Sequence, residues 1–441
     1  MLTSKYKSPF FALCLAATFC LGTFSACGKD PAPEEIQDES SGSAESESLP
    51  AQSDSEAKDE EDGNLSTAND TKESAPEGSG AQESDADASD GDTQTAEDPE
   101  IAAMFGENCI TSQTFEVTLS EFDGAVWFVP YYHYPSEDQV APFIQIIQDG
   151  EVLSWIRRPQ SYAPESLSGQ RFLSLDEVSF TDVNFDGTTD VILIETYEDT
   201  TFATICYGKV DDYDDRVYFH SQEDLSENVT ANAETLTASG VRDYVTGGTE
   251  NGQFESYQDA YQTMARIKAM ESANKPVYDL IYVDDDEVPE LVSDHPGYFV
   301  SLYTYHDGSI YVLMDEWGYG AFGNHGYDYA PRKNSLYNFD TDGAGAILND
   351  TYMAIGEDHS LKILAMLTSY NYDDENGNGM PDEEEWGADT YQEGTYRYVD
   401  GEYVLVSEDE WKKYHKGEYE PISGCTSLDE LLAELTKSNT P

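Results

Sequence analysis

TDVNFDGTTDVILIE, residues 181–195, places oxygen-bearing side chains around a glycine and then continues directly into an apolar segment. Those side chains stand at positions 1, 3, 5 and 9 of the loop and are Asp182, Asn184, Asp186 and Asp190. Gly187 at position 6 allows a sharp bend, and Thr188 at position 7 can offer its carbonyl oxygen. Because Ca²⁺ takes about six to eight oxygen ligands, the stretch predicts a calcium loop that leads into a β-strand.

Two interpretations of this loop stay open at the level of sequence. One is the calcium loop, and the other is an Asp-Gly hairpin turn held by Asx hydrogen bonds. We favour the ion, because a turn does not need so many acceptors and their mutual repulsion would cost stability. Position 12 is Leu193 and not a bidentate glutamate, so the affinity for Ca²⁺ should be modest, on the order of 10⁻⁴ to 10⁻³ M.

A second candidate loop is DENGNGMPDEEE, residues 374–385. It fills all the side-chain positions of an EF-hand loop with Asp374, Asn376, Asn378, Asp382 and Glu385. Pro381 and the lack of a clear preceding helix count against a metal site, so a flexible acidic surface loop is the alternative. We include its ligands in the predicted calcium set.

A third loop, VDDDEVPELV at residues 283–292, also runs from acidic residues into an apolar strand. Tyr282 stands where the first ligand would be, and Glu287 replaces the glycine. We expect this copy to keep the turn and to be degenerate as a metal site. DTDGAG, which begins at Asp340, is expected to be a plain turn.

The first and third loops resemble the loop-strand signature of FG-GAP and VCBS-type repeats, which bind Ca²⁺ at the edge of a propeller-like sheet. The longer passage DEVSFTDVNFDGTTDVILIETYEDTTFATICYG, residues 176–208, is similar to domains of bacterial surface and periplasmic lipoproteins. Some of those proteins inhibit cell-wall-degrading toxins. The resemblance implies an extracytoplasmic location and a β-rich fold.

The N-terminus has the pattern of an export signal. Lys5 and Lys7 precede the apolar run FFALCLAATFCLGTF, which is followed by FSAC ending at Cys27. This ending resembles a bacterial lipobox, with Phe24 where the family usually has leucine, and it implies lipidation of Cys27. An uncleaved anchor helix is the alternative, and either would hold the chain at the outer face of a bacterial membrane.

Residues 28–100 hold 24 Asp and Glu against 3 Lys and few apolar side chains. Such a segment cannot offset its chain entropy by burial, so we predict a disordered, extended acidic linker. The whole chain has a formal net charge of −67. That charge excludes nucleic acid as a natural partner and suits cations or basic partners.

The folded part is predicted to be mainly β or α+β, with two β-rich units of propeller-blade-like antiparallel strands and a few helices. Alternating segments such as AVWFVPYY and FIQIIQDGEVLSWI predict a first domain at 101–225. A second α+β domain at 250–441 opens with a helix over 253–273, whose apolar stripe is Phe254, Tyr257, Tyr261, Met264 and Ile267. Ser407 and Ser427, each followed by glutamate three residues later, predict two short helices.

No common catalytic motif occurs in the chain. The most enzyme-like passage is DEWGYGAFGNHGYDY, where Asp315, Glu316 and His325 lie among aromatic residues. We expect packed aromatics with a solvated acidic rim there, and we expect His133 to be a packed or surface residue. Cys109, Cys206 and Cys425 are an odd number with no CxxC spacing, so we expect inert buried thiols, with one disulfide bridge as the alternative.

From these observations we predict a non-enzymatic lipoprotein with a calcium-binding ectodomain that recognises a protein or a cell-wall polysaccharide. The alternative is an extracellular wall-glycan hydrolase, or an inhibitor of such enzymes, acting near Trp317 to His325.

Overall fold

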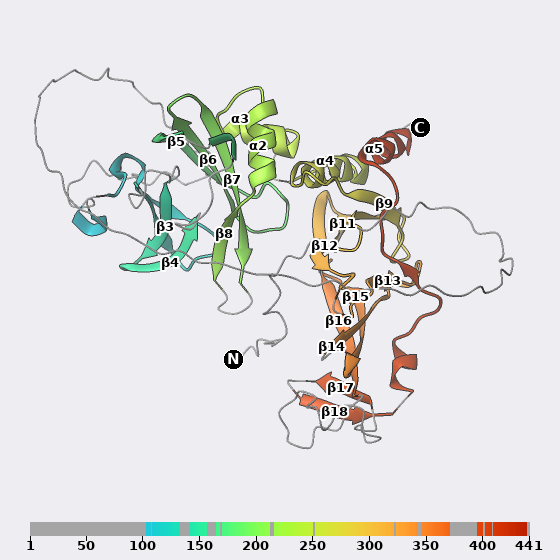
Figure 1. Cartoon of the computed structure of the whole chain (residues 1–441). Helices are drawn as coiled ribbons and strands as arrows, with labels where there is room; N and C mark the ends of the chain where they lie inside the picture. The colour runs from blue at the N-terminus through green and yellow to red at the C-terminus, as the bar shows by residue number, and fades with distance from the viewer. Residues whose placement is uncertain are drawn as a thin grey trace, which may run out of the picture. The chain divides into compact units, whose positions relative to one another are not determined.

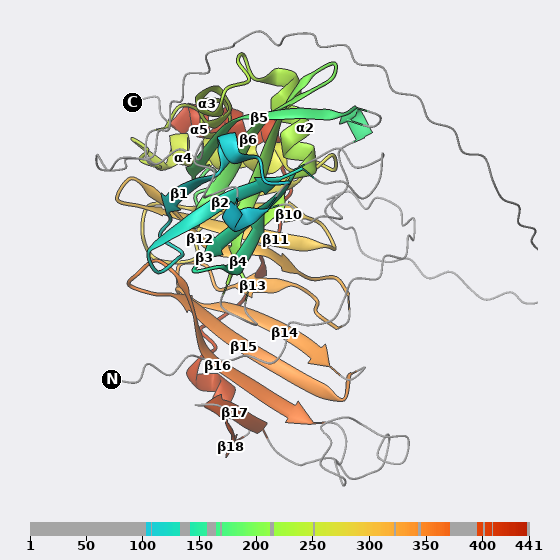
Figure 2. The same cartoon turned by 90° about the vertical axis from the view of Figure 1, so that its left-hand side faces the viewer.

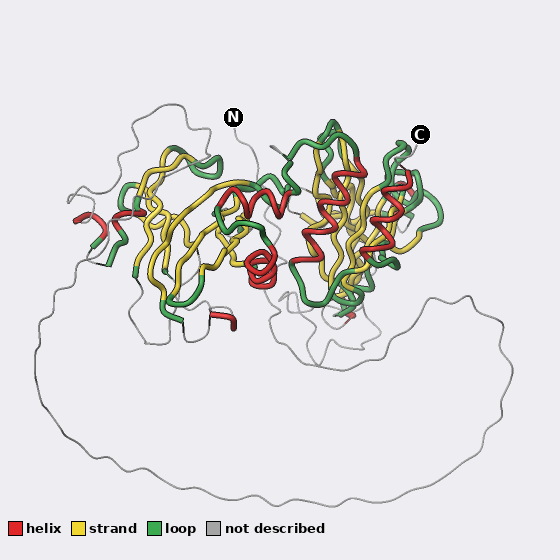
Figure 3. Tube along the Cα trace, turned by 90° about the horizontal axis from the view of Figure 1, so that it is seen from above, coloured by secondary structure: helices red, strands yellow, loops and turns green. Residues whose placement is uncertain are grey.

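The computed structural model describes residues 103–438 except 107, 133–141, 157–164, 168–169, 212–215, 250–251, 322, 343–344, 371–394, 400–401 and 408. All of the described residues belong to one compact unit. Strands dominate it, and helices are few (Figure 3). The prediction of a mainly β fold with a few helices is therefore confirmed.

The first sheet has the strand order β1-β2-β3-β4-β8-β7-β6-β5 (Figure 1). Its strands are β1 Phe115–Thr118, β2 Ala125–Tyr131, β3 Phe143–Gln148, β4 Glu151–Ile156, β5 Phe172–Thr181, β6 Asp190–Tyr197, β7 Thr201–Val210 and β8 Val217–Ser221. β4 and β8 pair in parallel, whereas the other neighbours are antiparallel. Two short 3₁₀ turns, Thr111–Gln113 and Glu165–Leu167, flank these strands.

Two further antiparallel sheets follow. The second has the order β12-β11-β10-β9, with β9 Val277–Ile281, β10 Glu290–His295, β11 Phe299–His306 and β12 Ser309–Gly318. The third has the order β18-β17-β16-β15-β14-β13-β19, and β14, β15 and β16 lie side by side in Figure 2. Its strands are β13 Tyr327–Tyr329, β14 Leu336–Asp342, β15 Ile347–Ile355, β16 Leu361–Tyr370, β17 Thr395–Val399, β18 Glu402–Val406 and β19 Glu420–Pro421.

The strands β5 to β8 and β9 to β12 form two meanders of the same order. In the first, Thr181 pairs with Asp190 across the loop, and in the second Ile281 pairs with Glu290. The two hairpin loops are therefore in identical register, with an offset of 100 residues between them. The similarity of the two sequence stretches corresponds to a structural repeat.

The helices are α2 Glu223–Asn232, α3 Ala238–Thr246, α4 Tyr257–Met270 and α5 Leu428–Ser438. α5 begins with the predicted capping box, in which Glu430 accepts from the Ser427 backbone N–H at 3.0 Å and donates its own N–H to Ser427 Oγ at 3.4 Å. The segment after Ser407 forms a 3₁₀ helix, Glu410–Lys413, with no side-chain cap. The sequence analysis did not predict α2 and α3, because their short, polar sequences carry little helical periodicity.

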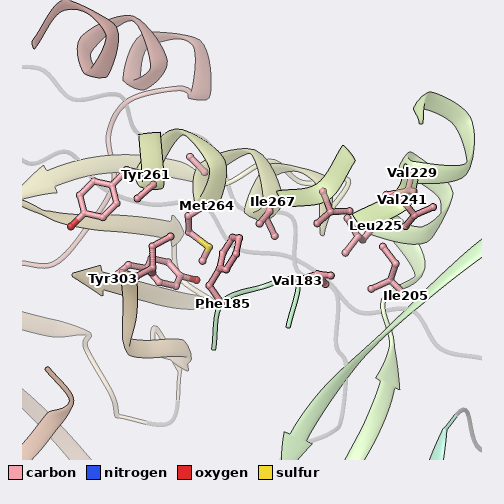
Figure 4. Close-up of a cluster of buried hydrophobic side chains, with 14 of the residues drawn as sticks. Val183, Phe185, Ile205, Leu225, Val229, Val241, Tyr261, Met264, Ile267 and Tyr303 are labelled. Atoms are coloured by element: carbon pink, nitrogen blue, oxygen red, sulfur yellow. The ribbon is translucent and has the colours of Figure 1, made fainter. Parts of the chain in front are cut away.

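One hydrophobic core joins the helices to both meanders. The predicted stripe of α4 supplies Tyr261, Met264 and Ile267, all of which are buried. Val183 and Phe185 come from the loop between β5 and β6 and pack into the same core, as Figure 4 shows. The loop that carries the candidate ligands is thus anchored by apolar side chains, which limits how far it can move.

Truncation of the β6 core should be costly. Ile192 is fully buried in this core, and Ile192→Ala should lower the free energy of unfolding by about 2–5 kcal/mol through lost burial and an unfilled cavity. Ile363 on β16 is 67% exposed, so Ile363→Ala should change it by about 0.5 kcal/mol or less. Urea unfolding followed by circular dichroism measures both, and equal losses would contradict the assigned core.

Candidate metal sites

The first loop is held by its own side chains. Asp182 Oδ2 accepts from the Gly187 backbone N–H at 2.9 Å, and Asn184 Oδ1 accepts from the Asp186 N–H at 3.2 Å. Asp186 Oδ1 accepts from the Thr188 N–H at 2.7 Å. These bonds turn one oxygen of each side chain toward the backbone. Asp182 Oδ1 is buried and has no hydrogen-bond partner among the described residues.

The backbone of this loop uses the left-handed region twice. Gly187 has φ +85° and Phe185 has φ +60°. A non-glycine residue in this region is strained. Phe185 is held there by its burial in the core and by edge-on packing against Phe254, with ring centroids 5.3 Å apart. Gly187 thus adopts, at the bend, the left-handed backbone conformation that its predicted role requires.

Asp190 lies at the base of the loop and is fully buried. Its Oδ2 accepts from the Val183 N–H at 2.8 Å, and its Oδ1 accepts from the Gly208 N–H on β7 at 3.0 Å. Burial raises the pKa of Asp190 well above its ordinary range, and the charges of Asp186 and Asp182 raise it further. This carboxyl closes the loop onto the neighbouring strand as well as standing beside the other candidate ligands.

The pKa values of the other two carboxyls of the first loop, Asp182 and Asp186, are also raised. Burial, and next the charge of Asp186, raise the pKa of Asp182 to about 6. Burial also raises the pKa of Asp186, and the charge of Asp315 adds to this effect. A cation between these groups would relieve the repulsion and lower the pKa of both carboxyls.

Glu121 adds a carboxylate that the sequence analysis did not find. Its Oε1 accepts from the Thr189 backbone N–H at 2.7 Å, and its Oε2 is buried without a hydrogen-bond partner in the described part of the chain. Glu121 precedes the loop by about 60 residues, so no local spacing pointed to it. The two segments lie at opposite ends of the strand order and do not pair. They meet because both ends of the sheet pack in one core, where Phe180 contacts Phe115 and Phe128.

The second hairpin loop repeats this hydrogen-bond pattern. Glu290 Oε2 accepts from the Val283 N–H at 2.7 Å, Asp284 Oδ1 from the Asp286 N–H at 3.1 Å, and Asp286 Oδ1 from the Val288 N–H at 2.8 Å. Unlike the first loop, its residues 282–290, all described, include none with positive φ. The turn is built without the glycine that the first loop requires.

The second loop also gathers its acids most closely. Oxygens of Asp284, Asp286 and Glu290 lie within 4.8 Å of one another, the one such group of three or more acidic, histidine or cysteine side chains among the described residues. Glu290 is fully buried, and burial raises its pKa to about 8, with backbone donation from Val283 opposing this and the two aspartates adding to it. The loop that we expected to be degenerate therefore has the tighter set of acidic oxygens.

The remaining predicted ligands cannot be placed. The loop with Asp374, Asn376, Asn378, Asp382 and Glu385 lies outside the described residues. The same holds for Cys27, the acidic segment 28–100 and His133. Thr188, whose carbonyl was predicted to add a ligand, lies in the first loop as expected, and its side chain is half-buried.

The two carboxylates of the enzyme-like passage form ion pairs with lysines. Asp315 Oδ2 lies 3.0 Å from Lys209 Nζ, and Glu316 Oε1 lies 3.4 Å from Lys268 Nζ. His325 instead packs against Phe339, with ring centroids 6.2 Å apart. Among the described residues, no hydrogen bond or ion pair joins His325 to Asp315 or Glu316.

Two of the cysteines match the expectation of buried thiols and one does not. Cys109 and Cys206 are buried, whereas Cys425 is exposed, and none of the three forms a disulfide in the described structure.

Within the described residues, no helix is long and apolar enough to span a membrane. Compared with models of protein families and with curated protein sequences, the chain matched none.

The buried acid of the second loop should make metal-free stability depend on pH. The pKa of Glu290 rises from an ordinary 4.5 to about 8 in the folded protein, so its contribution is complete below about pH 4.5 and is lost as pH rises through about 8. In EGTA, the melting temperature of Glu290→Gln should therefore fall less between pH 5 and 8 than that of the parent protein. Glu287→Gln, at an exposed acid of the same loop, is the control. Parallel profiles for Glu290→Gln and the parent would contradict the assignment.

Proposed function

We propose that this protein is an extracytoplasmic lipoprotein whose β-rich ectodomain binds Ca²⁺ at two equivalent hairpin loops and recognises a protein or a cell-wall polysaccharide without catalysis. The observation that carries the proposal is the pair of matching loops, each with a buried acid at its base that accepts a backbone N–H from across the loop. In the second loop the oxygens of Asp284, Asp286 and Glu290 also lie within 4.8 Å of one another. Carboxylates placed so closely repel one another unless a cation or protons separate them.

The donor set favours calcium over transition metals. Both loops offer carboxylate and backbone carbonyl oxygens, the first adds the Asn184 amide oxygen, and neither contains cysteine or histidine. Hard cations such as Ca²⁺ prefer oxygen ligands, and Ca²⁺ tolerates irregular geometry better than Mg²⁺ does. In the first loop Asp182, Asn184, Asp186 and Asp190 would hold the ion, with the Thr188 carbonyl. Asp284, Asp286 and Glu290 would hold it in the second.

The state of the free oxygens supports an ion in the first loop. A buried carboxylate oxygen without a partner is costly, and Asp182 Oδ1 is such an atom. The backbone N–H groups of the loop already use the opposite oxygens. The unused oxygen is therefore available to a cation without breaking the hydrogen bonds that shape the turn.

A role in recognition is favoured over catalysis by the ion pairs at Asp315 and Glu316. A general acid and base must be free to exchange protons with a substrate, and both carboxylates lie beside lysines. The lipid anchor at Cys27 and the acidic linker of residues 28–100 are proposed from sequence. Together they would hold the ectodomain at the outer face of the membrane and away from its surface.

Calcium titration with paired variants tests the two loops separately. Asp182→Asn with Asp186→Asn keeps the backbone acceptors but removes two charges, so we expect the loss of one bound ion and at least about a tenfold weaker response there. Asp284→Asn with Asp286→Asn should remove a second ion. Isothermal titration calorimetry counts the ions, and the rise in melting temperature with Ca²⁺ gives an independent measure.

The control is Asp340→Asn with Asp342→Asn, which removes two neighbouring acids from β14, outside both loops. It should leave the number of ions and the calcium-dependent rise unchanged. Equal effects of all three double variants would mean that Ca²⁺ only screens the net charge, and the proposal would fail. The proposal would also fail if the parent protein bound no Ca²⁺ at millimolar concentration.

A further inference from the structure

A cavity of about 570 Å³ lies among α2, α3, α4 and α5, and its lining includes no residue of either loop. Its volume is within the range of pockets that bind small molecules, roughly 300–1,000 Å³. Val245, Met270, Leu428 and Leu432 supply apolar walls from three of the helices. The cavity can therefore bury a hydrocarbon body.

The charge of the lining is opposite to that of the chain. The protein contains 89 Asp and Glu against 22 Lys and Arg. The twelve residues that line the cavity include no acid and two bases, Arg266 and Lys275. This is a local cationic site on a strongly acidic protein, and an anion is the ligand that it would attract.

The two basic side chains differ in the hydrogen bonds that they already make. Lys275 Nζ donates to the carbonyls of Ala269 and Ser272 at the end of α4. Arg266 is exposed and makes no hydrogen bond or ion pair with any other described residue. Its guanidinium therefore remains available to a ligand, and it presents a planar fork that suits a carboxylate.

The other polar side chains of the cavity are committed to the helices. Asn232 Nδ2 donates to the Asn228 carbonyl at 2.8 Å, and Thr263 Oγ1 donates to the Asp259 carbonyl at 3.1 Å. The Tyr244 hydroxyl donates to Asn228 Oδ1 at 3.3 Å. Recognition of an anionic head group thus depends mainly on Arg266.

We propose that this cavity binds an amphipathic monocarboxylate, with the hydrocarbon body between the helices and the carboxylate on Arg266. The apolar walls select a ligand with a chain or ring, and the single available guanidinium selects one negative charge. A more highly charged anion would be repelled more strongly by the chain, whose formal net charge is −67. This site is separate from the calcium loops and does not rest on them.

Calorimetric titration of the full-length protein with decanoate tests this proposal, with decanol and decylamine as ligands of the same chain length. Decanoate should bind with a stoichiometry of one, and the other two should bind at least about tenfold more weakly, because a charge-assisted hydrogen bond contributes roughly 1.5–3 kcal/mol. The titration is run in EGTA and again in Ca²⁺. Failure of the calcium proposal would leave the decanoate result unchanged.

Arg266→Gln should weaken decanoate binding by at least about tenfold and leave decanol binding unchanged. Arg171→Gln removes the same charge from an arginine that pairs with Glu198 at 3.0 Å on the first sheet, so it is the matched control. Leu432→Glu, which places an acid in the apolar wall, should abolish decanoate binding; circular dichroism checks that this variant is folded.

Three results would overturn the proposal. The first is equal binding of decanoate and decanol, which would leave a non-specific apolar cavity. The second is an equal effect of Arg266→Gln and Arg171→Gln on decanoate binding. Arg266 would then act only through its contribution to the net charge and not by contact with the carboxylate. The third is no binding of decanoate to the parent protein, including the case in which another part of the chain occupies the cavity.

Discussion

The hairpins β5-β6 and β9-β10 each depend on a buried carboxyl that accepts a backbone N–H from across the loop. Asp190 does this for Val183, and Glu290 does it for Val283. A buried backbone donor left unpaired would cost as much as a lost hydrogen bond. The acid therefore fixes the start of one strand relative to the end of the preceding strand. The valine that donates the N–H is itself buried, so the same short segment secures both the turn and the packing.

This arrangement links the loops to the polar residues between the two meanders. Lys268 on α4 is buried, and its Nζ lies 2.7 Å from Glu271 Oε2 and also contacts Glu316. The Tyr207 hydroxyl donates to Glu271 Oε1 at 2.7 Å, one residue before the glycine that donates to Asp190. A buried ion pair of this kind adds little net stability but penalises arrangements that separate its members. The loop, β7 and α4 are therefore positioned together.

Local chemistry explains what the sequence analysis predicted well. The side-chain hydrogen bonds within the first loop join residues at most seven positions apart. The spacing of Asp182, Asn184 and Asp186 was therefore sufficient to predict the Asx-bonded turn, which was the alternative to the calcium loop, and the ion stays a prediction. The buried stripe of α4 followed from helical periodicity in the same way. The capping box at Ser427 succeeded because both partners lie within one turn, whereas the similar pattern at Ser407 produced only a 3₁₀ turn.

Non-local contacts explain what the sequence analysis missed. Glu121 reaches Thr189 only because the two ends of the first sheet, which do not pair, pack in one core. The second loop was expected to be degenerate because Tyr282 and Glu287 depart from the motif. Its acids, Asp284, Asp286 and Glu290, nevertheless stand at positions 3, 5 and 9 of the motif, so this close set of oxygens is local and forms without the glycine. The cavity between the helices likewise depends on α2 and α3, whose sequences carry weak signals.

The two loops also differ in what they lose on folding. The first bends through Gly187 and a strained Phe185, whereas the second bends with ordinary backbone angles and contains Pro289. A proline-containing, glycine-free segment samples fewer conformations when unfolded, so ordering it costs less entropy. The second loop is therefore the better preorganised of the two. If both loops hold the proposed Ca²⁺, the hairpin of β5 and β6 would loosen first on its gradual removal and that of β9 and β10 would persist, so the protein would relax in two stages.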